Sequence, residues 1–192
     1  MKKILIATLV GSIIMFVWQA VSWMVMPTHT QTFHYTPAQD SILAALKNSG
    51  ITTGAYFVPM IDNTHVSSFD PEYQKKNKEL MEKQIGKPSA TIIYQEAMPP
   101  MDPGQFLRGF LYTLIAMFCV CMLLSLAYQS DASFFMRWWM VMLIAIVYTM
   151  MGPMMGHNWM MEPWHYTTGF IYDAFIGWGL TGLWLAKYLK KS

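Results

Sequence analysis

Four long stretches that are almost free of charge constrain this chain more than any other feature. The hydrocarbon core of a bilayer is about 30 Å thick, so a helix that crosses it needs about 20 mostly apolar residues. The stretches that meet this requirement are residues 4–26, 105–128, 137–156 and 166–187. Only 12% of the chain is charged and 54% is hydrophobic, whereas soluble domains average about 25% and 45–50%. The sequence therefore predicts a mainly α membrane protein, a bundle of four transmembrane helices.

The first stretch follows two lysines and could be mistaken for a signal peptide. Its apolar run is longer than the usual 7–15 residues or so of a signal peptide, and no cleavage site of small residues follows it. Pro27 ends the run instead. We expect an uncleaved anchor.

Basic residues near the ends of the stretches predict the orientation, because Lys and Arg gather in short cytoplasmic segments. With both termini cytoplasmic, the inner side would hold one acid, Asp131, against Lys2, Lys3, Arg137, Lys187, Lys190 and Lys191. The short segment between the third and fourth stretches, residues 157–165, has no Lys or Arg. We therefore expect a multi-pass protein of a bacterial inner membrane, with residues 27–104 extracytoplasmic.

Residues 27–104 carry the signals of a small α/β insert between the first two spans. Thr36 to Gln39 matches a capping box with proline at the first helical position, which predicts a helix over residues 37–47. Asp70-Pro71 predicts a second helix to about residue 85, and short β-prone runs at 55–58 and 90–94 predict two strands. Since a domain of this size rarely has a sufficient core, we expect it to rest on the outer ends of the spans.

Asp173 is the sharpest single feature of the apolar stretches. An acid inside a membrane is costly, so it normally faces protein or water and has a partner. Arg108 enters the second span from the same side at a similar level, which predicts an intramembrane ion pair between Asp173 and Arg108. The pair could fix helix packing or form a proton or cation site. We favour packing, because one acid without a second buried acid or histidine is a poor proton relay.

The last span is rich in small residues. Small side chains let helix backbones approach closely in lipid. The spacing predicts helix packing through Ala174, Gly177, Thr181 and Gly182.

Methionine is unusually frequent, with 19 residues, and six fall between Met150 and Met161. Thioethers and imidazoles suit Cu(I). A soft-metal site would use Met154, Met155, His157, Met160, Met161 and His165. Methionine is also an adaptable apolar filler, and it abounds elsewhere in the third span. We favour the filler interpretation and expect no cofactor, with copper as the alternative.

The remaining patterns exclude more functions than they indicate. A net charge of +2 without a basic stripe argues against nucleic-acid binding. No nucleophile with its base, nucleotide loop or paired-carboxylate motif is evident, so we expect no catalytic residues. The preferred hypothesis is a non-enzymatic accessory or scaffolding protein that binds another membrane protein, or a second copy of itself, through its outer face. The alternatives are periplasm-facing Cu(I) or Ag(I) handling and a small transporter that uses Asp173.

Short motifs spread along the chain resemble a family of bacterial four-span inner-membrane proteins with no assigned activity. The residues that carry the resemblance are Phe16-Val17-Trp18, Ser22, Pro27, Gly54-Ala55-Tyr56, Pro59, Ile92-Ile93-Tyr94, Asn158-Trp159, Asp173, Gly177-Trp178 and Gly182-Leu183. The resemblance implies a shared architecture in which Asp173 belongs to a pattern with Gly177 and Trp178. The run from Met150 to Met161 departs from that pattern, so the resemblance gives no support to a copper role.

Overall fold

The computed structural model describes residues 1–30, 32–100, 102–127 and 132–190. The chain divides into two compact units. One, here called the bundle, combines residues 1–35 with the segment after residue 100, and the other, here called the insert, is residues 36–100. Tyr128, which ends the second predicted span, and Asp131 and Lys191, which enter the charge argument, lie outside the described residues.

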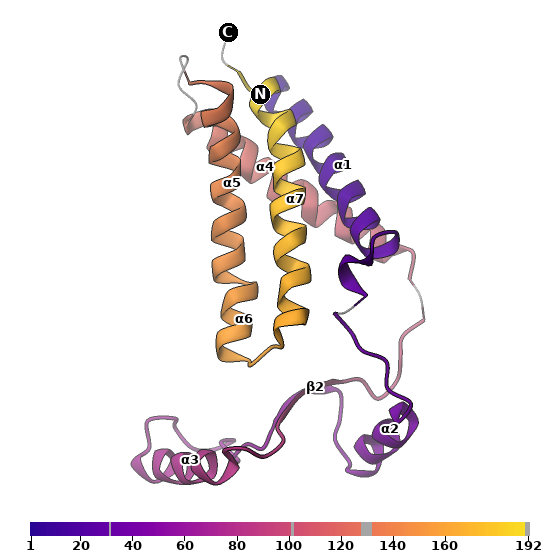
Figure 1. The fold of residues 1–192 in the computed structure, drawn as a ribbon, viewed down its shortest axis with the longest axis vertical. Coiled ribbons are helices and arrows are strands. Elements are labelled where there is room, and N and C mark those ends of the chain that lie inside the picture. The colour runs from indigo at the N-terminus through magenta and orange to yellow at the C-terminus, as the bar shows by residue number, and fades with distance from the viewer. Residues whose placement is uncertain (31, 101, 128–131, 191–192) are drawn as a thin grey trace. The chain divides into compact units, whose positions relative to one another are not determined.

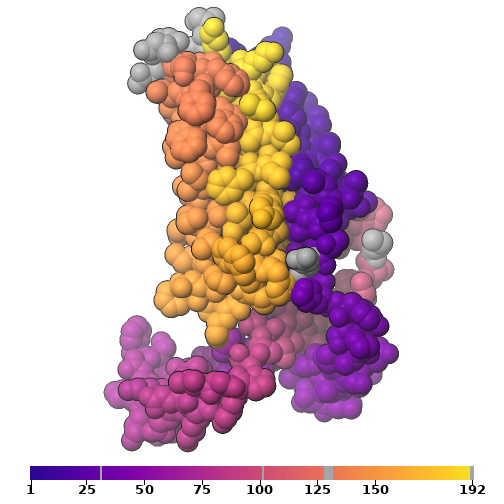
Figure 2. All heavy atoms as spheres, in the orientation of Figure 1, coloured from indigo at the N-terminus to yellow at the C-terminus, as the bar shows by residue number. Residues whose placement is uncertain are grey.

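The bundle consists of helices (Figure 1). In chain order they are α1 (Lys2–Met24), the 3-10 turn η1 (Pro27–His29), α4 (Gly104–Ala127), α5 (Phe134–Met151), α6 (Pro153–Trp159) and α7 (Trp164–Tyr188). Helix α7 packs against both α5 and α1, while α4 packs mainly on α1. Figure 2 shows α7 in yellow between orange α5 and indigo α1.

Three segments of the bundle are long and apolar enough to cross a membrane: Lys2–Met24, Gly104–Ala127 and Phe134–Trp159. Helix α7 is equally long, with 25 residues, but it is not apolar enough to be among them. Its hydropathy is lowered by Asp173, Lys187 and several glycine and threonine residues. The glycine and threonine residues that are buried are Thr167, Gly169, Gly177, Thr181 and Gly182. The structure therefore supports a mainly helical membrane protein with three candidate spans.

Proline divides the third segment in two. Pro153 has no backbone N–H to donate, so the regular hydrogen bonding of α5 cannot continue through it. Helix α5 ends at Met151, Gly152 takes φ −108° and ψ −92°, and α6 begins at Pro153. The Gly152 N–H still donates to the Tyr148 carbonyl at 2.9 Å. Helical hydrogen bonding resumes beyond the proline, where the Gly156 N–H donates to the Gly152 carbonyl at 3.0 Å.

Small residues of α7 set how closely the helices approach. A Cβ atom on Gly177 would lie 2.8 Å from Met15 Sδ and 2.9 Å from Trp18 Cδ1 of α1. On the opposite side, a Cβ atom on Gly182 would lie 3.2 Å from Val141 Cβ of α5. Ala174 and Thr181, the other residues predicted for packing, are also buried. All four lie where α7 meets its neighbours.

The insert contains two helices and two strands. They are α2 (Gln39–Asn48), β1 (Gly54–Val58), α3 (Pro71–Gln84) and β2 (Ala90–Tyr94). The strands form a two-stranded antiparallel sheet, with Gly54 opposite Tyr94 and Val58 opposite Ala90. Helix α3 begins where the sequence predicts, since the Asp70 carboxylate caps it by accepting from the N–H groups of Glu72 and Tyr73.

Helix α2 begins two residues later than the capping-box pattern predicts. The Thr36 hydroxyl accepts a hydrogen bond from the Ala38 N–H at 3.2 Å, so it closes a local turn and provides no cap. Ala38 precedes the helix without a side-chain cap. The physical reason is that threonine side chains bond readily to backbone groups two residues away, which competes with helix initiation.

The insert has very little core. Neither α2 nor α3 has a buried residue, and Tyr94 is the only buried hydrophobic side chain in residues 36–100. Large apolar side chains are instead exposed, including Phe69 at 85%, Ile93 at 83% and Ile85 at 81%. The predicted helices and strands are present, but they do not enclose a hydrophobic interior of their own.

Candidate functional site

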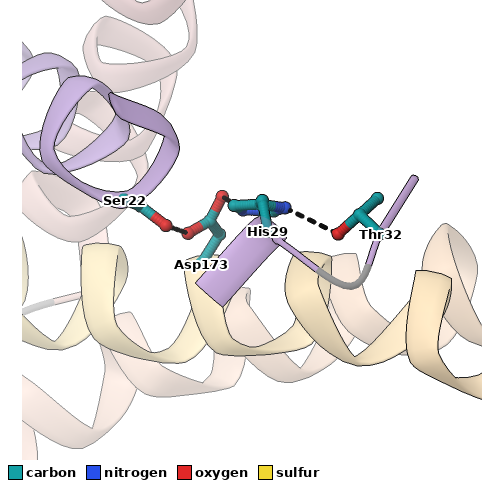
Figure 3. A network of polar contacts seen from close by, with 4 residues as sticks. All are labelled: Ser22, His29, Thr32 and Asp173. Carbon is teal, nitrogen blue, oxygen red and sulfur yellow. Dashed lines mark hydrogen bonds and ion pairs between the residues drawn. The ribbon is translucent and has the colours of Figure 1, made fainter. Parts of the chain in front are cut away.

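A polar network inside the bundle centres on Asp173 of α7. Its Oδ2 atom lies 2.9 Å from Nε2 of His29, and the side chains of His29 and Asp173 are only 5% and 15% exposed. The other carboxylate oxygen, Oδ1, accepts a hydrogen bond from the Ser22 hydroxyl of α1. Figure 3 shows the carboxylate between these two groups. The acid that the sequence singles out therefore joins α7 to α1 and to the turn that follows α1.

A tight turn after α1 brings His29 to the carboxylate. Helix α1 ends at Met24, and Pro27 begins the 3-10 turn that ends at His29. The Thr32 N–H donates to the His29 carbonyl at 3.0 Å, which keeps the chain curled at this point. The proline fixes its own φ, so the turn is favoured before any tertiary contact forms.

Aromatic rings and a glycine hold the imidazole in place. The Trp23 ring stacks on His29 with centroids 3.8 Å apart and planes 9° apart, and Phe170 meets the ring edge at 5.7 Å. Gly169 makes room for it, since a Cβ atom there would lie 2.9 Å from His29 Nδ1. The ring is thus held by one stacked ring, one edge contact and a close approach of the α7 backbone.

The two nitrogen atoms of His29 have different partners. Nε2 faces the carboxylate, and Nδ1 lies 3.1 Å from the Thr32 hydroxyl. A neutral imidazole with its proton on Nε2 donates to Asp173 and accepts from Thr32. In that state the His–Asp pair carries one net negative charge, and a protonated imidazole makes the pair neutral. The geometry accepts either state without moving a heavy atom.

The order hydroxyl, imidazole, carboxylate from Thr32 through His29 to Asp173 resembles the arrangement that activates a nucleophile. The burial of these side chains argues against nucleophilic catalysis by the Thr32 hydroxyl. Thr32 is 4% exposed and His29 is 8% exposed, so a substrate could not reach the hydroxyl. Ser22 is fully buried and bonds to the carboxylate instead of the imidazole. The expected absence of catalytic residues stays a prediction.

A cavity of about 530 Å³ borders the network on the side of Asp173. It lies among α1, α4, α5 and α7. Its lining is mostly apolar and aromatic, with a few polar groups, and includes Gln19, Trp23, Thr113, Tyr148, Phe170 and Trp178. This volume and lining fall within the range of small-molecule sites, which are about 300–1,000 Å³ and mainly apolar.

The predicted ion pair between Asp173 and Arg108 is wrong. The Arg108 guanidinium pairs with Asp102 at 2.7 Å, and both side chains are about half exposed. Asp102 also accepts from the Gly104 N–H at 2.8 Å where α4 begins. The physical reason is proximity, because a carboxylate six residues away at the helix start is available without any helix contact.

The methionine and histidine residues of the alternative metal site are spread over α6, the segment after it and the start of α7. His157 Nδ1 lies 2.7 Å from the Glu162 carbonyl oxygen, and His165 stacks on His34 with centroids 4.4 Å apart. Met155, Met160 and Met161 are exposed. In the part of the chain that the structure describes, no group of three or more His, Cys, Asp or Glu side chains could hold a metal ion. Cu(I) binding by these residues stays a prediction.

The sequence patterns missed His29, Ser22 and Tyr148 as members of the site. A signal for His29 does exist, because it follows the end of the first span by a few residues and lies on the same predicted side as Asp173. Arg108 was predicted as the partner instead, because it enters the second span from the same side at a similar level. Ser22 belongs to the pattern of the family resemblance, and in the structure it binds the acid of that same pattern.

Comparisons with protein-family models, with curated proteins and with solved structures found no match to this chain. The resemblance to a four-span family therefore stays a prediction.

Proposed function

We propose that this chain is a non-enzymatic accessory protein of a bacterial inner membrane, with four spans and both termini cytoplasmic. In this proposal the insert binds another membrane protein or a second copy of the chain. The observation that carries it is the insert itself, which has helices and strands but exposes the apolar residues that would form a core.

Two contacts support α7 as the fourth span and support the orientation. The Lys3 ammonium donates to the Lys190 carbonyl, and the Arg137 Nε donates to the Ala186 carbonyl at 2.8 Å. The start of α1, the start of α5 and the end of α7 thus lie together at one end of the bundle. Basic residues concentrated at one end are what the positive-inside rule requires of a cytoplasmic side.

Energetics support a partner for the insert. Helices of about 12–15 residues or fewer are marginal in water without packing, and α2 and α3 have 10 and 14 residues without a buried side chain. Burying one large apolar side chain contributes about 1.5–3 kcal/mol. A partner that covers Phe69, Ile85 and Ile93 would therefore stabilise the insert considerably.

The test is crosslinking in native membranes of the full chain, followed by mass measurement in mild detergent. We expect a discrete complex in the wild type and its loss in the triple variant Phe69→Ser, Ile85→Ser, Ile93→Ser. Two differently tagged copies, expressed together, distinguish a second copy from another protein.

The matched control replaces three exposed lysines of the same segment, Lys75→Ser, Lys83→Ser and Lys87→Ser. It removes the same number of long exposed side chains but leaves the apolar ones, so the complex should persist. A wild-type chain that remains monomeric under crosslinking, or a complex that survives the apolar substitutions, would overturn the proposal.

A further inference from the structure

The cavity beside Asp173 combines two features that partner binding by the insert does not use. Its lining includes the aromatic residues Trp23, Tyr148, Phe170 and Trp178. Asp173 is the only charged residue of the lining, and no Lys or Arg lines the cavity in the described part of the chain. Here we call it the aromatic cavity.

The charge balance of the aromatic cavity favours a positive ligand. Asp173 is held by a hydroxyl and an imidazole, and neither group is a permanent cation. In the described part of the chain, the carboxylate thus has no lysine or arginine beside it in the lining of about 530 Å³ of open volume. A carboxylate in a low-dielectric environment attracts a cation more strongly than it would in water.

The aromatic rings favour a particular kind of cation. The faces of Trp, Tyr and Phe carry negative potential and attract ammonium groups, most strongly when the cation is poorly hydrated. A small metal ion would need several oxygen ligands, and the polar lining besides Asp173 offers few. An organic cation satisfies both parts of the lining, because its charge faces the carboxylate and its apolar groups face the rings.

We propose that the aromatic cavity binds a lipophilic organic cation, with the positive group next to the Asp173 carboxylate and the apolar groups against the surrounding rings. The proposal does not depend on the partner of the insert, because the cavity is formed by the bundle alone.

The test uses the full chain in a neutral detergent and measures binding by titration calorimetry, with empty micelles subtracted. The probe is tetraphenylphosphonium, a lipophilic cation without a titratable group. Tetraphenylborate has nearly the same shape and the opposite charge, and it serves as the control ligand. We expect saturable binding of the cation only.

Variants separate the role of charge from the role of the rings. Asp173→Asn should weaken binding of the phosphonium at least about tenfold, which is about 1.4 kcal/mol, because it removes the charge and keeps the shape. Asp102→Asn, an acid outside the cavity, should leave binding unchanged. Tyr148→Leu should weaken it by roughly threefold to tenfold through the lost cation–π contact. Tyr172→Leu changes an exposed tyrosine of α7 and should have no effect.

Four results would overturn the proposal: equal binding of the borate, no saturable binding of the phosphonium, unchanged affinity in Tyr148→Leu, or unchanged affinity in a folded Asp173→Asn variant. If Asp173→Asn does not fold, the comparison of Tyr148→Leu with Tyr172→Leu still tests the proposed binding site, because neither tyrosine belongs to the hydrogen-bonded network. An unchanged affinity in a folded Asp173→Asn variant would leave a merely hydrophobic groove and end the cation assignment.

Discussion

The bundle and the insert both contain regular helices, yet they differ in how many side chains they bury to stabilise those helices. In the bundle, α7 buries eight residues against its neighbours, and its acid is bonded to two other elements. In the insert, α2 and α3 bury none. Helix formation and core formation are therefore separate properties, and local sequence signals control only the first.

The difference has a consequence for how each unit responds to substitution. Within the bundle, a change at one contact disturbs helices that lie far apart in the sequence. Within the insert, a change should act on one element only, because few side chains transmit it further. Three substitutions test this contrast, beginning with the largest expected effect.

Replacing His29 by alanine should destabilise the bundle by about 3 kcal/mol, because it leaves a mostly buried carboxylate with one partner. Unfolding in mixed micelles, followed by tryptophan fluorescence, measures the loss. His34→Ala is the control, since that ring is exposed and stacks only on His165, and its effect should stay within about 0.5 kcal/mol. Equal losses in the two variants would show that the network contributes nothing beyond a surface contact.

Gly177→Ala should cost about 1–3 kcal/mol, because the new methyl group would lie 2.8 Å from Met15 Sδ and 2.9 Å from Trp18 Cδ1. Gly179 is two residues further along the same helix, and a Cβ atom there would first meet Met142 Sδ at 3.8 Å. Gly179→Ala should therefore be neutral or slightly stabilising, since alanine favours the helix. The same unfolding measurement compares them, and a neutral Gly177→Ala would mean that α1 and α7 are not tightly packed.

Asp70→Ala should have the smallest effect, about 1 kcal/mol, because it removes the side chain that caps α3. We expect faster amide hydrogen exchange within residues 71–84 and unchanged exchange in the bundle. Glu79→Ala, an exposed change in the middle of α3, is the control and should leave exchange nearly the same. Faster exchange in the bundle as well would show that the two units are coupled. That result would contradict the expectation that a change in the insert acts on one element only.

Local signals in the sequence predicted the elements well. Asp70-Pro71 locates the start of α3 because the cap and the proline act within four residues. The apolar stretches locate α1, α4 and α5 as candidate spans for a similar reason, since hydropathy is a property of each segment. A fourth span could not be established in this way, because Asp173, Lys187 and the glycine and threonine residues of α7 lower its hydropathy.

The site was predicted in part. Asp173 stood out because an acid in an apolar run needs a partner, and the structure gives it His29 and Ser22. The identity of the partner depends on where the turn after α1 points, which no pattern along the chain encodes. Arg108 was chosen by its level in the membrane, but Asp102 is much closer to it along the chain and forms the pair.

In the proposed four-span arrangement, the polarity of α7 also bears on how the chain would enter the bilayer. An aspartate near the centre of a lone helix raises the cost of insertion by about 2.5–3.5 kcal/mol. Since α1, α4 and α5 precede α7 in the sequence, their surfaces are available when α7 is synthesised. Ser22 and the imidazole of His29 are then present to receive the carboxylate. In that arrangement, the network that joins α7 to α1 would help to keep α7 in the bilayer during biogenesis, because lipid alone would hold this segment poorly.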